Sequence, residues 1–153
     1  MKVVIIYCSK HHKNTKKLLD SIEDENLTLI EAKNDLQIDL NKYDIIGFAS
    51  GIYYQNFDEL VIYNLEKFLP QNKDVFFIYT CGIKRNIYTN KITKLAKLRN
   101  SNILGIYSSR GYDTFGPFKF IGGIAKNHPN SKDISGVIDF YKNILVMYNE
   151  KLK

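Results

Sequence analysis

Five short runs, most of them apolar and each ending at a polar or small-residue turn, alternate with helical patterns along this chain of 153 residues. The first run, residues 3–8, is typical of a strand that is buried on both faces. Strands that alternate with helices predict a parallel sheet with helices on both faces and right-handed connections. The predicted strands comprise residues 3–8, 27–32, 44–50, 74–80 and 102–108.

Apolar residues at three- and four-residue spacing predict the helices between these strands. The predicted helices begin near Asn14 and comprise residues 58–68, 86–98 and 134–148 after it. The strand at residues 27–32 alternates in polarity, so we expect it at an edge of the sheet. Residues 109–132 form a long connection rich in Gly, Pro and aromatic residues. No repeat or linker divides the chain, which predicts a single domain of residues 1–153.

The net charge is +6 and the pI is about 9.2, with lysines spread over the whole chain. Solubility is the first interpretation of this charge. An acidic partner protein or an anionic cofactor comes second, and nucleic acid third, so we expect no nucleic-acid partner. No apolar run is long enough to span a bilayer, and the N-terminal run is too short for secretion. We therefore expect a cytoplasmic protein with no membrane partner.

The two cysteines, Cys8 and Cys81, form no C-x-x-C pair and have no zinc-type spacing with histidine. This pattern argues against a disulfide framework, a structural zinc site and an iron–sulfur cluster. Both cysteines follow apolar runs, so we expect two reduced, partly buried thiols. Cys8 also lacks the arginine six residues later that a low-molecular-weight tyrosine phosphatase requires, because Asn14 stands there.

Residues 9–15, Ser-Lys-His-His-Lys-Asn-Thr, connect the first strand to the first helix. Asn14 and Thr15 are good candidates for the residue that caps this helix. The first N–H groups of a helix lack partners, and the helix dipole adds positive charge there. Four lysines strengthen the field: Lys10, Lys13, Lys16 and Lys17. We interpret the loop as a phosphate-binding loop.

Ligands of open α/β sheets bind beyond the carboxyl ends of the strands, where the strand order reverses. Three loops lie at such ends, residues 9–15, 50–56 and 80–85, and we expect them to converge on one ligand. The chain contains neither G-x-G-x-x-G nor G-x-x-x-x-G-K-[ST], so neither a dinucleotide fingerprint nor a P-loop is supported. A response-regulator receiver is also disfavoured, because the residues after the first strand are basic rather than acidic.

Two segments resemble the flavodoxin family. Residues 9–15 resemble an FMN-phosphate loop of the form S-x-H-H-G-N-T-x-K, although Lys13 stands in place of the glycine, which adopts positive φ more readily. Residues 111–124 resemble the G-[FY]-D-T-[FY]-G-P-x-K-x-I-G-G segment of small single-domain flavodoxins. Residues 47–53 and 126–133 extend the likeness. The resemblance implies a flavodoxin-like three-layer α/β sandwich with a five-stranded parallel sheet of order 2-1-3-4-5. It also implies FMN between the first and third strands.

The resemblance further implies roles for fifteen residues around FMN. Those expected at the phosphate are Ser9, His11, His12, Asn14 and Thr15, with exposed loop histidines as the alternative for the two His. Those expected beside the isoalloxazine ring are Ser50, Gly51, Ile52, Tyr53 and Tyr54. Backbone groups expected at its pyrimidine edge belong to Thr80, Cys81 and Gly82. Tyr112 and Phe115 are expected to wall the site, with a sheet cover or a partner surface as alternatives.

The leading functional hypothesis is therefore an FMN-binding, flavodoxin-like protein that acts in electron transfer. An FMN-dependent NAD(P)H or quinone oxidoreductase is the first alternative, and a flavin-free module that binds another anion is the second. We assign no catalytic residue and no metal ligand. The expected partners are redox proteins, with acidic ones favoured by the basic charge, and the chain is expected to be a monomer or a weak homodimer.

Overall fold

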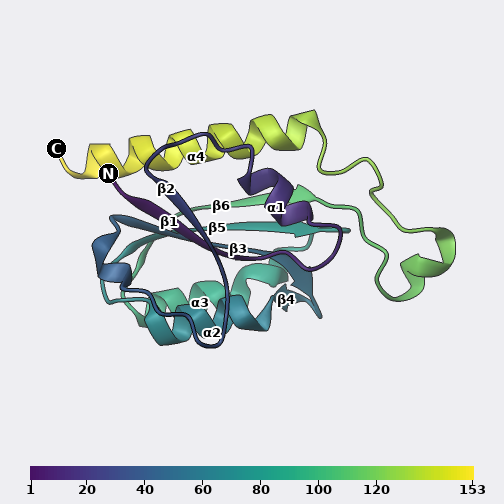
Figure 1. Cartoon of the computed structure of the whole chain (residues 1–153), viewed down its shortest axis with the longest axis horizontal. Coiled ribbons are helices and arrows are strands. Elements are labelled where there is room, and N and C mark those ends of the chain that lie inside the picture. The colour runs from purple at the N-terminus through teal and green to yellow at the C-terminus, as the bar shows by residue number, and fades with distance from the viewer.

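The computed structural model describes residues 1–153 as a three-layer α/β sandwich, in which α1 and α4 cover one face of the sheet and α2 and α3 the other (Figure 1). The strands are β1 Val3–Cys8, β2 Leu27–Glu31, β3 Ile45–Tyr53, β4 Asn56–Phe57, β5 Asp74–Cys81 and β6 Asn102–Arg110. The α-helices are α1 Asn14–Leu19, α2 Glu59–Phe68, α3 Asn90–Leu98 and α4 Ser131–Lys151. Three 3₁₀ turns are η1 Leu40–Lys42, η2 Asn86–Thr89 and η3 Gly116–Ile121.

The strand order is β2-β1-β3-β5-β6, with every pair on this path parallel, and β4 pairs antiparallel with β3. Because β5 and β6 are the fourth and fifth of the predicted strands, the predicted order 2-1-3-4-5 is confirmed, and so is the edge position of β2. The chain leaves β1 toward one edge and leaves β3 toward the other. A crevice is therefore expected between the carboxyl ends of β1 and β3.

Apolar side chains pack on both faces of the central strands. Val3 and Ile5 of β1 face the α1 and α4 layer, whereas Val4 and Ile6 face α2 and α3, because successive side chains of a strand point to opposite faces. All four are fully buried. This two-sided burial explains why the run at residues 3–8 is uninterrupted. None of the helices combines the length and the apolar character that crossing a membrane requires.

The predicted loop at residues 50–56 is largely a β-hairpin. β3 continues through Tyr53, and the chain returns as β4 after a turn at Tyr54 and Gln55, which both have positive φ. Phe57 of β4 pairs with Ile52 and is buried, so packing stabilises the return strand. A two-residue turn of this kind is usually marked by Asn-Gly or Asp-Gly, and Tyr-Gln is not such a marker.

Three other predicted boundaries also differ. β6 extends to Arg110, and the long connection after it contains η3 and a bridge between Asp113 and Ile124. The first turn of the predicted helix at residues 86–98 is the separate 3₁₀ turn η2. α4 begins at Ser131, three residues before the predicted start.

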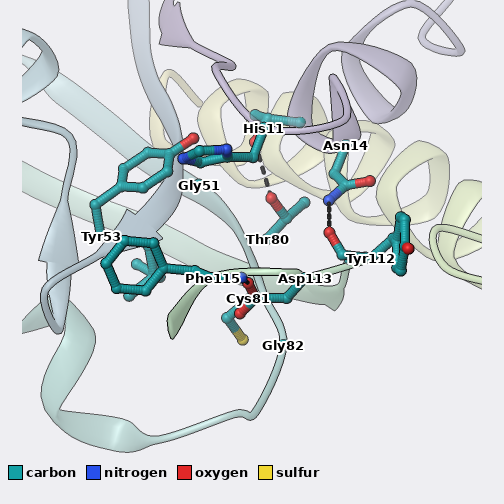
Figure 2. Close-up of a pocket in the computed structure, with 13 residues that line it drawn as sticks. His11, Asn14, Gly51, Tyr53, Thr80, Cys81, Gly82, Tyr112, Asp113 and Phe115 are labelled. Atoms are coloured by element: carbon teal, nitrogen blue, oxygen red, sulfur yellow. Dashed lines mark hydrogen bonds between the residues drawn. The ribbon is translucent and has the colours of Figure 1, made fainter. Parts of the chain in front are cut away.

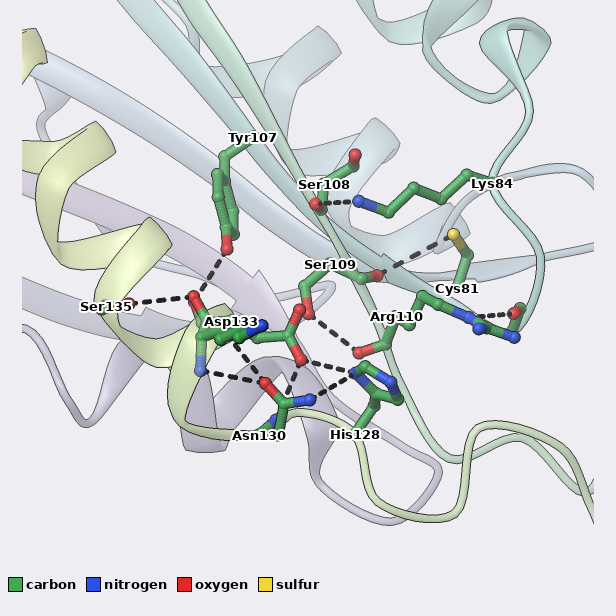
Figure 3. A network of polar contacts seen from close by, with 12 residues as sticks. Cys81, Lys84, Tyr107, Ser108, Ser109, Arg110, His128, Asn130, Asp133 and Ser135 are labelled. Carbon is green, nitrogen blue, oxygen red and sulfur yellow. Dashed lines mark hydrogen bonds and ion pairs between the residues drawn. The ribbon is translucent and has the colours of Figure 1, made fainter.

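A capping box fixes the start of α4 (Figure 3). The Asn130 side chain accepts hydrogen bonds from the backbone N–H groups of Lys132 at 2.9 Å and Asp133 at 3.2 Å, and the Asp133 carboxylate accepts one from the Asn130 N–H at 2.9 Å. That carboxylate also lies 2.6 Å from the His128 Nδ1. Burial alone would raise the pKa of Asp133, but these hydrogen bonds outweigh it, so the pKa lies below its ordinary value.

We expect Asn130→Ala to lower the free energy of unfolding by about 1 kcal/mol, because two N–H groups at the start of α4 lose their acceptor. Urea denaturation measures the effect. Asn127→Ala is the matched control: Asn127 is exposed and lies outside the cap, so its change should stay within about 0.5 kcal/mol. Equal losses in the two variants would contradict a stabilising role for the cap.

Candidate functional site

A small hollow of about 30 Å³ lies at the carboxyl ends of β1, β3 and β5, at the crevice that the strand order predicts (Figure 2). Its lining comprises His11, Asn14, Thr15, Gly51, Ile52, Tyr53, Thr80, Cys81, Gly82, Gly111, Tyr112, Asp113 and Phe115. Eleven of these belong to the fifteen residues that the sequence analysis assigned to a site. The three predicted loops do converge, and the start of the long connection after β6 joins them.

The loop after β1 reaches α1 through two left-handed residues, His12 and Lys13, with φ of 52° and 53°. Lys13 is the N-cap residue, and its side chain makes no capping hydrogen bond, so the prediction that Asn14 or Thr15 caps the helix is wrong. The Ser9 hydroxyl instead accepts the backbone N–H of Lys16, in the first turn, at 3.1 Å. Neither Asn14 nor Thr15 caps the helix, and both side chains are buried at the hollow.

Asn14 carries the one buried side-chain polar atom of this site that has no hydrogen-bond partner. Its Nδ2 donates to the backbone oxygen of Tyr112 at 2.8 Å, which fixes the orientation of the amide, and its buried Oδ1 has no hydrogen-bond partner. Gly111 makes this contact possible, because a Cβ there would lie 2.7 Å from Nδ2. An amide oxygen only accepts hydrogen bonds, so Oδ1 suits a ligand hydroxyl or N–H. The sequence predicts Asn14 at a phosphate, which offers no such donor when fully ionised.

Tyr53 joins the β3–β4 hairpin to the loop after β1. Its hydroxyl accepts the Lys10 backbone N–H at 3.2 Å, and its ring lies 5.4 Å from that of His11. A Cβ at Gly51 would lie 2.7 Å from the Tyr53 hydroxyl, so only glycine lets the ring fold back over the strand. Burial raises the pKa of Tyr53. A second link is the 2.6 Å ion pair between Lys10 and the buried Asp58 at the start of α2.

Phe115 separates three hollows. Its ring borders the 30 Å³ hollow and two larger ones of about 340 Å³ and 270 Å³. It is half exposed, and it packs edge-on against Tyr54 with ring centroids 5.4 Å apart. Phe115 is the one residue that lines all three hollows.

The last two residues of β5 supply two buried groups. The Thr80 hydroxyl shares a 2.9 Å hydrogen bond with that of Thr15, and either can be the donor. The Cys81 thiol is buried at the edge of the hollow, and burial raises its pKa to about 11. A thiolate rather than a thiol is the nucleophile, so Cys81 is protonated and unreactive near neutral pH. A Cβ at Gly82 would lie 2.7 Å from the Asp113 carboxylate, so this glycine allows the two segments to touch.

Four predicted residues lie outside the lining. Ser50 is fully buried and accepts the Asp58 N–H at 2.8 Å, and Ser9 caps α1. His12 hydrogen-bonds to Thr114 at 3.1 Å, and Tyr54 is 82% exposed at the hairpin turn. Two lining residues were missed as site residues, Gly111 and Asp113. Both belong to the G-Y-D-T segment that carries the resemblance, so that segment could have indicated them.

No family model matches the chain. The uncharacterized protein MJ0298 of Methanocaldococcus jannaschii is 37% identical over 148 residues, which cover 95% of this chain and 99% of that protein. The chain belongs to the family of this archaeal protein. That relative has no described activity, so the family by itself carries no function.

Solved structures support the fold. A flavodoxin from the domain Archaea has a TM-score of 0.66 at 16% identity and covers 94% of this chain and 99% of its own. General stress protein 14 of Treponema denticola, solved in complex with FMN, has a TM-score of 0.60 at 12% identity over 97% and 98%. These identities are low, so the likeness shows a flavodoxin-like fold and no more. The fold expected from the sequence is thus confirmed.

Lys13→Gly should raise the free energy of unfolding by up to about 1 kcal/mol, because glycine adopts the φ of 53° without the steric cost that a Cβ carries. Lys17→Gly is the matched control: it also removes an exposed lysine, but within α1, where it should cost about 1 kcal/mol. Thermal and urea denaturation measure both variants. A loss of stability in Lys13→Gly would mean that the lysine side chain itself stabilises the loop.

Proposed function

We propose that this chain binds FMN at the carboxyl end of its sheet and transfers electrons between other proteins. The observation that carries the proposal is the buried, unpaired Oδ1 of Asn14 in a hollow at the β1–β3 crevice. The FMN-bound Treponema denticola protein, which shares the fold, adds support. The proposal goes beyond the family relationship, because the archaeal relative is uncharacterized.

The polar end of FMN fits the residues of the loop after β1. The backbone N–H groups of His12, Lys13 and Thr15 have no backbone partner, and they accompany four lysines in residues 10–17. Such a loop can hold the phosphate. The ribityl chain of FMN carries hydroxyl groups, which are the donors that Asn14 Oδ1 lacks. The donors and the acceptor of this site therefore match both polar parts of the cofactor.

The ring end of FMN requires Phe115 and Tyr53 to move. The central hollow of about 30 Å³ is smaller than a flavin, but Phe115 separates it from two larger hollows. The residues available to hold the ring are Ile52 and Tyr53 of the hairpin, Cys81 at the end of β5 and Gly82 after it. Phe115 is half exposed at the surface, so its displacement leaves the core intact.

The chain itself contributes binding and water exclusion. FMN supplies the redox chemistry when bound. Tyr53 and Phe115 shield the site from water, and Cys81 stays a neutral thiol near neutral pH because burial raises its pKa to about 11. No side chain of the lining is arranged as a nucleophile with its base. This arrangement favours a carrier over an enzyme that acts on a bound substrate.

FMN binding tests the proposal directly. We expect purified protein to quench FMN fluorescence in a saturating titration and to release FMN, identified by mass, on denaturation. Asn14→Ala tests the carrying observation with three ligands: FMN, riboflavin and lumiflavin. Loss of one hydrogen bond, about 1 kcal/mol, should raise Kd about five- to tenfold for FMN and riboflavin. It should leave Kd unchanged for lumiflavin, which has no ribityl chain.

A merely structural effect of Asn14→Ala would weaken all three ligands alike and contradict the assigned contact. The free energy of unfolding of the variant shows whether a uniform loss of binding comes from misfolding. Failure of the wild-type protein to bind FMN at micromolar concentrations would overturn the proposed function as a whole.

One observation favours the alternative of an FMN-dependent oxidoreductase. The hollow of about 340 Å³ beside Tyr53, lined in part by Lys10, Phe57 and Lys91, has room for a second small molecule. We expect the FMN-loaded protein to oxidise NADPH or NADH below about 1 s⁻¹ with a quinone acceptor, since typical enzymes turn over at or above that rate. Absorbance at the nicotinamide band measures it, and faster turnover would support the enzyme over the carrier.

A further inference from the structure

The lysines occur along the whole chain, but the acidic residues do not. Residues 81–132 contain one acidic residue, Asp113, and ten basic ones, a net charge of +9 in a chain of net +6. The ten are Lys84, Arg85, Lys91, Lys94, Lys97, Arg99, Arg110, Lys119, Lys126 and Lys132. Residues 20–44 contain eight acidic residues and two lysines, a net charge of −6. Residues 1–19 add five lysines and no acidic residue, so residues 81–132 carry the larger of two basic excesses.

The fold brings these two segments to opposite edges of the sheet. Residues 20–44 include β2, which forms one edge, whereas residues 81–132 include α3, β6 and η3 at the other. None of the ten basic residues forms an ion pair. The molecule is consequently polarised across its sheet, and a field of this kind orients a charged partner before contact.

Exposed apolar side chains accompany the basic ones. On η3, which projects beyond the sheet in Figure 1, Phe120 is 91% exposed and Ile121 68%. Ile87 and Leu98, of η2 and α3, are also exposed. Large apolar groups with this exposure, surrounded by one sign of charge, are typical of a surface that a protein covers.

Residues 82–98 and 116–126, which carry these basic and apolar side chains, meet beside the candidate site. The hollow of about 270 Å³ is lined by Ile83 and Arg85 of residues 82–98, by Phe118 of residues 116–126, and by Phe115, which also lines the candidate site. Lys84 fastens its loop to β6 by donating to the backbone oxygen of Ser108 at 2.8 Å (Figure 3). We call residues 82–98 and 116–126 together the basic face. It adjoins the opening from which the proposed FMN would exchange electrons.

We infer that the basic face docks an acidic electron-transfer protein, whose redox group is thereby brought to the mouth of the candidate site. The redox nature of the partner rests on the proposed function, whereas the acidic docking rests on the charges alone. The acidic edge around β2 would repel a long polyanion such as nucleic acid. Two of the three arginines, Arg99 and Arg110, donate to backbone oxygens of Glu66 and Gly82, which leaves Arg85, the lysines and the apolar groups to make the contact.

Two double variants distinguish the effect of the basic face on binding from the effect of net charge. Lys94→Glu/Lys119→Glu reverses two exposed charges of the basic face, and Lys33→Glu/Lys42→Glu reverses two exposed charges outside it. Both lower the net charge from +6 to +2. None of the four lysines lines the candidate site or forms an ion pair, so folding and FMN binding should be unaffected.

The probe is an acidic [2Fe–2S] ferredoxin, titrated into ¹⁵N-labelled, flavin-free protein at about 20 mM salt. We expect amide shifts on the basic face, and a Kd that rises at least tenfold in Lys94→Glu/Lys119→Glu but less than twofold in the control variant. Raising the salt to about 200 mM should weaken binding strongly, because screening shortens the range of the field. Phe120→Ser should weaken binding without changing the dependence on salt.

Four results would overturn the inference. The first is an equal loss of ferredoxin affinity in the two double variants, and the second is amide shifts on the β2 edge instead of the basic face. The third is tighter binding of duplex DNA or of anionic vesicles than of the ferredoxin. The fourth is self-association of the protein at low salt, measured by sedimentation. Because the titration uses flavin-free protein, it is independent of the proposed cofactor. Ferredoxin binding without FMN binding would retain the docking face and remove electron transfer, and the reverse result would remove the face alone.

Discussion

The pairing of β1 with β3 at the centre of the sheet is the constraint on which the rest of the structure depends. From this pair the chain continues toward opposite edges, to β2 on one side and to β5 and β6 on the other. The loops after β1 and β3 therefore diverge and leave a crevice at the carboxyl ends. The hollow lined by Asn14, Tyr53 and Thr80 lies in that crevice, and the oppositely charged segments are separated by the same topology.

The candidate site combines tight packing with one unpaired group. Gly82 and Gly111 let segments that are distant in sequence touch, and Gly51 lets the Tyr53 ring fold back, since a Cβ at each would lie 2.7 Å from a neighbouring side chain. Buried polar atoms are normally paired, because an unpaired one costs about 1–3 kcal/mol. The lone Oδ1 of Asn14 therefore indicates a ligand more directly than the aromatic residues around it, which also have packing roles.

The candidate site and the basic face are neighbouring parts of the molecule. Lys10 of the loop after β1 lines the hollow of about 340 Å³ beside the site, whereas the basic residues of α3 and η3 belong to the basic face. The proposals assign a small anion to the loop after β1 and a protein to the basic face. This division links the proposed cofactor to the proposed partner through one opening.

The sequence by itself determined the alternation of strands and helices, because burial on both faces requires uninterrupted apolar runs such as residues 3–8. The resemblance then indicated the strand order and most of the lining, although Gly111 and Asp113 in the same segment were overlooked. The hairpin at Tyr54 and Gln55 was missed because the burial of Phe57, not turn chemistry, stabilises it.

Only the tertiary structure decided the role of Asn14. Asparagine before an apolar helical pattern predicts a cap, but a hydrogen bond to Tyr112, 98 residues away, turns the amide into the hollow. The sequence alone also did not show that the acidic and basic segments lie at opposite edges of the sheet. Both depend on contacts and distances across the fold, which local sequence patterns do not encode, whereas strands and helices follow from local periodicity.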